Sequence, residues 1–194
     1  MFDGPKSIGL EHIMIIPKQD FQANGITYTI RSASATDAKE LSALRVQIDG
    51  ETEFLDREPG EAFIDAPGFE QLIRADSEKK RNIFLVAVVQ GRIVGFSRCE
   101  GSQLKRFYHK LEFGVCVQKE FWGYSIGKNL LKQSMAWADS NGITKITLNV
   151  LETNEKAIAL YKMLGFEIEG ILKNDKILSD GQYYNTIVMG RCRE

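Results

Sequence analysis

Near its middle the chain reads Glu112-Phe113-Gly114-Val115-Cys116-Val117 and, three residues later, Phe121-Trp122-Gly123-Tyr124-Ser125-Ile126-Gly127-Lys128. The first part predicts a strand and the second a glycine-bearing turn, after which an amphipathic helix, a second strand and a second helix continue to Tyr161. A turn between a strand and a helix N-terminus offers unpaired backbone N–H groups and the positive end of a helix dipole. The pattern therefore predicts an anion site, and the anion that suits it is a phosphate.

The composition fits one domain. Of the 194 residues, 43% are apolar, which suffices for a single substantial core. The 25 Lys and Arg residues are balanced by 26 Asp and Glu residues, so the net charge is -1. Such a chain has no overall positive field to attract nucleic acid or an anionic membrane, and we expect neither as a partner.

Cysteine and histidine usage points to a reducing compartment and to no metal. The three cysteines, Cys99, Cys116 and Cys192, are odd in number and form no C-x-x-C pair, so we expect no disulfide framework. His12 and His109 are too few and too far apart to indicate a metal site. The longest apolar run, 83–89, is too short to span a membrane, and the N-terminus lacks a signal-peptide pattern. We expect a soluble, cytoplasmic protein.

Strands and helices are mixed along the rest of the chain. We expect strands at about 26–31, 83–89, 92–99, 110–117, 145–150, 166–177 and 182–189, and helices at about 41–48, 69–78, 126–141 and 155–164. Residues 1–25, with the apolar piece 13–16, are expected to form an N-terminal extension or an edge strand. Residues 26–192 are expected to form a single domain.

The central turn leaves alternatives open when it is read without reference to any family. Gly123-x-x-x-Gly127-Lys128 is one residue short of a P-loop, and Asn129 stands where Ser or Thr would ligate magnesium. A nucleotide site and a purely structural strand–helix turn are therefore the competing interpretations.

Two motifs together resemble the GNAT superfamily of acetyl-CoA-dependent N-acetyltransferases. They are Val117-(x)4-Trp122-Gly123-Tyr124-Ser125-Ile126-Gly127-Lys128-x-Leu130-Leu131 and Asn149-Val150-(x)3-Asn154-(x)2-Ala157-Ile158-x-Leu160-Tyr161-(x)2-Leu164-Gly165-Phe166. The resemblance covers about residues 26–189. It implies a mixed α+β fold, with a mostly antiparallel sheet of six to seven strands that is splayed in the middle and flanked by about four helices.

The resemblance also implies where acetyl-CoA, the co-substrate, would lie. Pantetheine would pair with the strand backbone and pyrophosphate would lie on the turn. The implied cofactor residues are Val115, Cys116, Val117, Trp122, Gly123, Tyr124, Ser125, Ile126, Gly127, Lys128 and Asn154. The chain departs from the family at two of them, because the family has Arg or Gln at Trp122 and Gly at Ser125. A Cβ at Ser125 restricts positive φ, although its hydroxyl can donate to phosphate.

Two side chains are candidates for proton transfer. Tyr161 lies two helical turns from Asn154, and the resemblance implies that it is the general acid for the departing thiolate. Glu112 stands on the strand where many relatives carry a base, acting directly or through water, and His109 is the less favoured alternative. Cys116 has no histidine partner in the sequence pattern, so we expect direct attack rather than a covalent enzyme intermediate.

The acceptor is predicted from a long acidic loop at about 49–67. Negative charge there would concentrate a cationic primary amine, either a small molecule or a peptide amine. The candidate acceptor residues are Glu51, Glu53 and Phe54. In the competing interpretation the carboxylates only keep the loop solvated. A CoA-binding regulatory module without turnover is the alternative function, and the sequence leaves a homodimer open.

Overall fold

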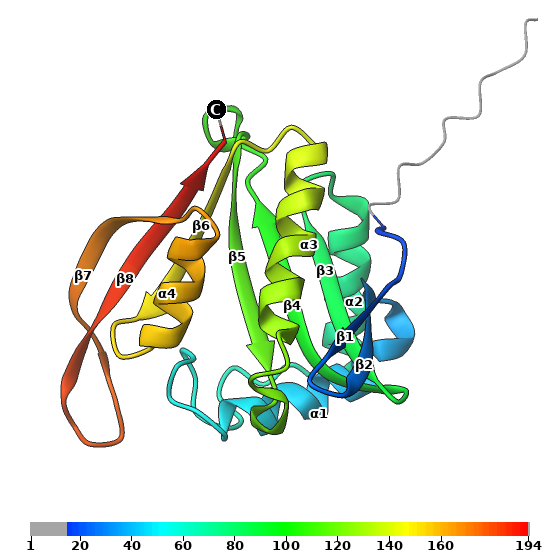
Figure 1. Cartoon of the computed structure of the whole chain (residues 1–194), viewed down its shortest axis with the longest axis horizontal. Helices are drawn as coiled ribbons and strands as arrows, with labels where there is room; N and C mark the ends of the chain where they lie inside the picture. Colours follow the sequence, from blue (N-terminus) through cyan, green and yellow to red (C-terminus); the bar gives the residue numbers. More distant parts are fainter. Residues whose placement is uncertain (1–14, 194) are drawn as a thin grey trace, which may run out of the picture.

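The structure, a computed structural model, describes residues 15–193 and has an eight-stranded sheet flanked by four α-helices (Figure 1). The strands are β1 (Gln19–Ala23), β2 (Ile26–Ser32), β3 (Ile83–Val89), β4 (Arg92–Gly101), β5 (Lys110–Val117), β6 (Lys145–Leu151), β7 (Glu167–Ile177) and β8 (Tyr183–Cys192). The helices are α1 (Ala38–Asp49), α2 (Ala66–Glu78), α3 (Ile126–Ser140) and α4 (Glu155–Met163).

The sheet is mixed but mostly antiparallel. Its strand order is β1-β2-β3-β4-β5-β6-β8-β7, and β5–β6 is the parallel pair. A parallel pair needs a crossover connection, which α3 provides. The predicted fold class is confirmed.

The two faces of the sheet carry separate apolar clusters. One contains Leu130, Leu131 and Trp137 of α3 against Leu111 and Phe113 of β5, and α4 packs at its edge. The other joins α1 and α2 to side chains of β3 and β4. The helices thus cover both faces, and the alternation along each strand divides its side chains between two cores.

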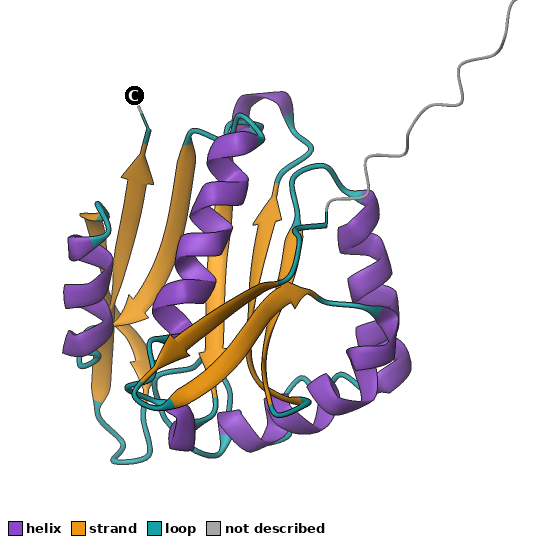
Figure 2. Cartoon of the chain, turned by 45° about the vertical axis from the view of Figure 1, so that its right-hand side comes forward, coloured by secondary structure: helices purple, strands orange, loops and turns teal. Residues whose placement is uncertain are grey.

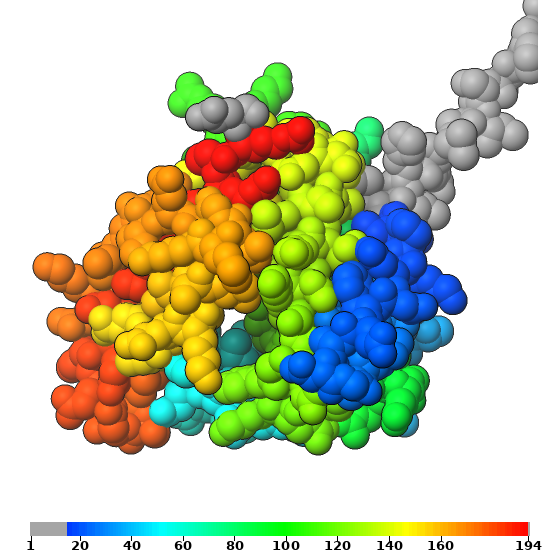
Figure 3. Space-filling model, in the orientation of Figure 1, coloured from blue at the N-terminus to red at the C-terminus, as the bar shows by residue number. Residues whose placement is uncertain are grey.

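The splay that the family resemblance implied is present between β5 and β6. These strands pair only from Lys110–Lys145 to Glu112–Thr147, although β5 continues to Val117 and β6 to Leu151. Beyond Glu112 the strands therefore diverge, and the space-filling view shows an opening between α3 and α4 (Figure 3).

The strand number is eight rather than six to seven. The additional strand is β1, which pairs antiparallel with β2 through the turn at Asn24 and Gly25. Its sequence, Gln-Asp-Phe-Gln-Ala, is short and mostly exposed, so it lacks the alternating apolar pattern by which strands are recognised. Of the predicted N-terminal apolar piece, residues 13–14 lie outside the described part of the chain, as does His12, while Ile15 and Ile16 are not in a strand.

Within residues 15–193 we find no helix long and apolar enough to cross a membrane.

Candidate active site

Unpaired backbone N–H groups gather at the turn between β5 and α3. Gly123 and Ser125 both have left-handed backbone there, with φ of +87° and +60°. The first hydrogen bond of α3 runs from Asn129 N to Ser125 O at 2.9 Å. Among the described residues, no protein acceptor bonds the N–H groups of residues 123 to 128, which follow one another directly. Such a row of donors at a helix N-terminus is built to hold an anion.

Ser125 carries the strain that its sequence position predicts. A side chain in the left-handed region costs about 1–2 kcal/mol, and Ser125 occupies that region where the GNAT pattern has glycine. Its hydroxyl makes no capping bond to α3. The hydroxyl is therefore available to an anion on the turn.

Trp122, the second departure from the pattern, joins the turn to its surroundings. The indole N–H donates to the carbonyl oxygen of Val117 at 2.8 Å, where β5 ends. The indole ring stacks on Phe54, with centroids 6.2 Å apart and planes inclined by 21°. Trp122 therefore links the end of β5 to the loop after α1.

Asn129 argues against the nucleotide interpretation. Its side-chain amide donates to the hydroxyl of Tyr28 at 2.7 Å, so it is oriented toward β2. A P-loop needs a magnesium-ligating hydroxyl at this position, and the amide is engaged elsewhere. Within residues 15–193, no group of three or more His, Cys, Asp or Glu side chains is arranged to hold a metal ion.

Beside the turn, β5 has one paired and one open edge. Val115, Cys116 and Val117 pair with Ser97, Phe96 and Gly95 of β4. Their other edge faces the opening from which β6 has diverged. An extended ligand with amide groups could add to this edge as a further strand, as the resemblance implies for pantetheine.

Tyr161 projects from α4 into the protein. Its ring packs against Phe166, with centroids 5.9 Å apart, and it borders the cluster under α3. Burial, together with a smaller contribution from the neighbouring Cys116, raises the pKa of Tyr161 to about 12. The phenol therefore keeps its proton at neutral pH, as a general acid must before it reacts.

Cys116 and Asn154 each have a structural role. Burial raises the pKa of the Cys116 thiol to about 12, so it is not a thiolate at neutral pH. Asn154 is the N-cap of α4, and its side-chain oxygen accepts from Ala157 N at 3.3 Å. Asn154 therefore caps α4 in this structure.

Glu112 and His109 lie at and just before the beginning of β5, away from Cys116 near its end. Glu112 is exposed on β5, opposite Glu100 of β4, at the point where β5 and β6 begin to diverge. Four residues of strand, roughly 13 Å, separate it from Cys116. His109 is exposed before β5 begins, and its carbonyl accepts from Thr144 and Lys145. Among the described residues, neither side chain forms a hydrogen bond with Tyr161, whose ring packs against Phe166.

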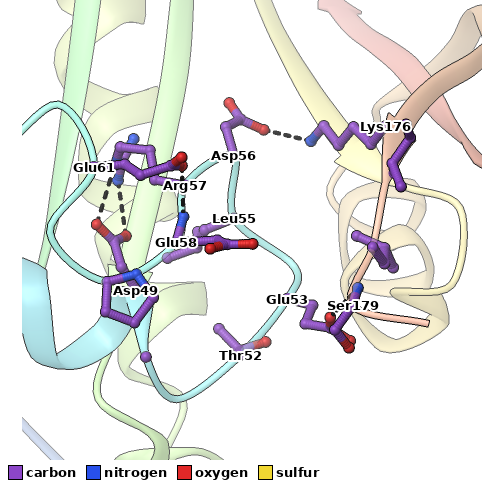
Figure 4. Close-up of a pocket in the computed structure, with 14 residues that line it drawn as sticks. Asp49, Thr52, Glu53, Leu55, Asp56, Arg57, Glu58, Glu61, Lys176 and Ser179 are labelled. Atoms are coloured by element: carbon purple, nitrogen blue, oxygen red, sulfur yellow. Dashed lines mark hydrogen bonds and ion pairs between the residues drawn. The ribbon is translucent and has the colours of Figure 1, made fainter. Parts of the chain in front are cut away.

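A cavity of about 610 Å³ lies between the loop after α1 and the β7–β8 hairpin (Figure 4). It is lined by Asp49, Gly50, Thr52, Glu53, Leu55, Asp56, Arg57, Glu58, Pro59, Glu61, Lys176, Ile177, Leu178 and Ser179. Five of these side chains are carboxylates and two are cations, so the lining has a net charge of -3. The acidic loop is thus the wall of a cavity.

Both cations in the wall already have carboxylate partners. Arg57 makes two hydrogen bonds to the buried Asp49, at 3.1 and 3.0 Å. Lys176 forms an ion pair with Asp56 across the cavity, as Figure 4 shows. The remaining carboxylates therefore set the sign of the electrostatic potential inside.

Of the three predicted acceptor residues, only Glu53 lines this cavity. Its carboxylate accepts from Ser179 N at 2.8 Å, and the hydrogen bonds from Ser179 lower the pKa of Glu53. Glu51 accepts from Lys119 N at 2.6 Å, and Phe54 stacks on Trp122. Glu51 and Phe54 thus tie the loop to the turn before α3.

The residues that sequence reasoning missed are Asp49, Arg57, Lys176 and Ser179. The last two are more than a hundred positions along the chain from the acidic loop. No local pattern marks such a pairing. The one feature of the sequence that could have indicated such a residue is Arg57, a single cation in a loop of carboxylates.

Comparison with known proteins agrees with this arrangement. Residues 48–166 match the model of the Acetyltransferase (GNAT) family. Over 134 residues the chain is 30% identical to the L-amino acid N-acetyltransferase AaaT of Escherichia coli K12, covering 69% of this chain and 74% of that protein. It is 29% identical over 134 residues to the spermidine N(1)-acetyltransferase of the same strain, covering 68% of each.

Among solved structures, yncA of Salmonella typhimurium, determined with its cofactor acetyl-CoA, superposes with a TM-score of 0.76. The identity is 18%, and the match covers 86% of this chain and 94% of that one. At this identity the likeness shows a shared fold. Taken with the family match, which spans more than half of the sequence, these findings assign the chain to the GNAT family of acetyltransferases, and it is an acyltransferase enzyme.

Proposed function

We propose that this enzyme transfers an acetyl group from acetyl-CoA to a primary amine by direct attack. The observation that carries the proposal is the row of unpaired N–H groups at residues 123–128, placed beside the open edge of β5. The row suits a pyrophosphate and the edge suits the amides of pantetheine. CoA contains both groups in one molecule.

The thioester would lie in the opening between β5 and β6. The protonated amine gives one proton to a base, and its nitrogen attacks the thioester carbonyl carbon. The C–S bond then breaks, the departing thiolate takes a proton from Tyr161, and the second proton lost by the new amide nitrogen restores the phenol. Tyr161 suits this role because it is neutral at physiological pH and borders the opening. Glu112 is the proposed base; because roughly 13 Å of strand separates it from Cys116, the proton would travel to it along a chain of several water molecules rather than directly.

For the acceptor, we propose a cationic amine, either a small molecule or a peptide amine. Support comes from the net charge of -3 in the cavity lining and from the engagement of Arg57 and Lys176 by carboxylates of the same wall. A carboxylate of an acceptor would find neither cation free. Of the two relatives compared, one is named for spermidine and one for L-amino acids, and the charge of the cavity favours the former class.

A panel of amines tests the proposal. Purified enzyme and acetyl-CoA are incubated with spermidine, a basic peptide, a neutral and an acidic L-amino acid, and thiol release and product mass are measured. We expect the highest kcat/KM for an acceptor with net positive charge. Highest activity with the acidic amino acid would contradict the acceptor class. Absence of CoA-dependent thermal stabilisation would contradict the cofactor, since a ligand at about 100 times its Kd adds roughly 2.7 kcal/mol.

The setting of the enzyme completes the proposal. Residues 26–192 form one domain, to which β1 adds an edge strand. A reducing, cytoplasmic location suits the thiols of Cys99, Cys116 and Cys192, which are all free.

For the oligomeric state, we propose a homodimer that forms through the edge strand β7. This strand exposes the apolar side chains of Ile168, Ile171 and Leu172. Light scattering on the purified protein tests the proposal.

A further inference from the structure

The hairpin β1–β2 lies against the start of α3. Figure 2 shows the two strands crossing in front of the sheet and reaching the lower end of this helix. Three hydrogen bonds connect the hairpin to α3 and to the turn before it: Asn24 donates to Gly123, Asn129 donates to Tyr28, and Gln133 donates to Gln19. The hairpin lies outside the segment 48–166 that matches the family.

The bond at the tip of the hairpin reaches the anion-binding turn itself. The side-chain amide of Asn24 donates to the carbonyl oxygen of Gly123 at 3.0 Å. Asn24 is held in the left-handed region, with φ of +48°, and Gly25 follows at +83°. Asparagine and glycine favour this pair of conformations, so the turn holds the backbone of Asn24 at a position from which its amide reaches Gly123.

The geometry of one peptide group connects this bond to the anion site. In a trans peptide, the C=O of one residue and the N–H of the next point in opposite directions. Because the C=O of Gly123 is held by Asn24, the N–H of Tyr124 is turned away from the hairpin. Tyr124 N–H belongs to the unpaired row at residues 123–128.

We infer that Asn24 is a positioning residue for the pyrophosphate of CoA. It touches no substrate; it fixes the Gly123–Tyr124 peptide so that the N–H of Tyr124 is presented to the anion before binding. Without this bond the peptide can rotate, because glycine permits almost any backbone conformation. The inference rests on the proposed function, and it assigns a role in cofactor binding to the N-terminal hairpin.

Asn24→Gly is the sharpest test, because glycine accepts φ of +48° and removes only the amide. We expect its Kd for CoA to rise about threefold to tenfold, the usual range for one hydrogen bond. Its KM for acetyl-pantetheine, which lacks the pyrophosphate, should equal that of the wild type. Asn24→Asp, which keeps the shape and places a charge near the phosphate, should weaken CoA binding further.

Gln133→Ala is the matched control, since it removes a hydrogen bond between the same hairpin and α3 but leaves the turn untouched. Its Kd for CoA should be unchanged. The inference is wrong if Asn24→Gly binds CoA as tightly as the wild type does. It is also wrong if the KM for acetyl-pantetheine rises by the same factor as the Kd for CoA. In both cases the proposed function stands. If the wild type itself binds CoA no better than pantetheine, the proposed function fails.

Amide shifts of Tyr124 give a second readout, independent of affinity. In the wild type, titration with CoA should shift this N–H to a single bound position. In Asn24→Gly the free-state resonance should already be displaced or broadened, because the peptide is no longer held. An identical free-state resonance in both proteins overturns the inference.

Discussion

The phenol of Tyr161 on the helix α4 lies within electrostatic range of Cys116 on the strand β5, at the edge from which β6 has diverged. The thiol of Cys116 contributes to the raised pKa of Tyr161, after the larger effect of burial. Their side chains border different clusters, Tyr161 the one under α3 and Cys116 the one under α1 and α2. Because β5 and β6 diverge beyond Glu112, β6 does not cover this part of β5, and the phenol of Tyr161 lies within electrostatic range of Cys116.

Removal of the Tyr161 hydroxyl should slow catalysis without loosening the cofactor. In Tyr161→Phe we expect kcat to fall by about 10² to 10⁴ with a small change in the KM for acetyl-CoA, because only proton donation is lost. Tyr184→Phe, which removes an exposed hydroxyl that donates to Asp180, is the control and should keep full activity. An unchanged kcat in Tyr161→Phe would remove Tyr161 from the mechanism.

The pKa of Tyr161 also predicts a stability change at high pH. With a pKa of about 12 in the folded state and about 10 in the unfolded state, the unfolded chain loses its proton first as the pH rises. The associated stability is complete below pH 10 and is lost as the pH rises toward 12. At pH 11 the wild type should have lost about 1.4 kcal/mol more than Tyr161→Phe, relative to pH 8. Urea unfolding of both proteins at the two pH values measures it; equal losses would contradict the assignment.

Cys116 should be dispensable for chemistry. Its thiol has a pKa of about 12 and is therefore unreactive at neutral pH, so Cys116→Ala should retain kcat within about threefold. Iodoacetamide at pH 7.5 should label the exposed Cys192 and leave both Cys116 and activity intact. Trapping of an acetyl group on Cys116 by mass spectrometry would instead establish a covalent intermediate.

Ser125 should report whether phosphate lies on the turn. Ser125→Gly relieves the left-handed strain, so CoA should bind within about tenfold of the wild type and the fold should not be destabilised. Ser125→Val should lose far more, because a β-branched residue resists φ of +60° and crowds the anion. Isothermal titration with CoA distinguishes the two, and equal binding by Val and Ser would place the phosphate elsewhere.

Local patterns in the sequence were enough to predict the turn, α3 and the strands on either side of it. The glycines, the apolar face of α3 and the strain at Ser125 all follow from residues within one short segment. An edge strand within residues 1–25 was one of the two predictions, but its position at Gln19–Ala23 could not be predicted, because this segment is stabilised by pairing rather than by its own pattern. The Asp56–Lys176 pair was likewise beyond prediction, since it depends on how distant segments pack.

The packing of the loop after α1 against the β7–β8 hairpin determines which carboxylates face the cavity and should select the acceptor. Glu53 and Glu58 line the cavity, whereas Glu51 is bonded to the turn before α3. The double variant Glu53→Gln/Glu58→Gln changes the net charge of the cavity lining from -3 to -1. A glutamine at position 53 can still accept the hydrogen bond from Ser179 N. We expect kcat/KM for the best cationic acceptor to fall and its dependence on salt to flatten, because screening has less charge to act on.

The control for that experiment removes the same charge from elsewhere on the surface. Glu78→Gln with Glu167→Gln neutralises two exposed carboxylates that do not line the cavity. If long-range attraction to the whole protein selects the acceptor, both double variants lose kcat/KM equally. If the cavity selects it, only the first pair does, and the loss should be larger for a polyamine than for a monoamine because each additional positive charge interacts with the same wall. A cavity variant that matches the wild type at every salt concentration would show that the acidic wall plays no part in acceptor choice.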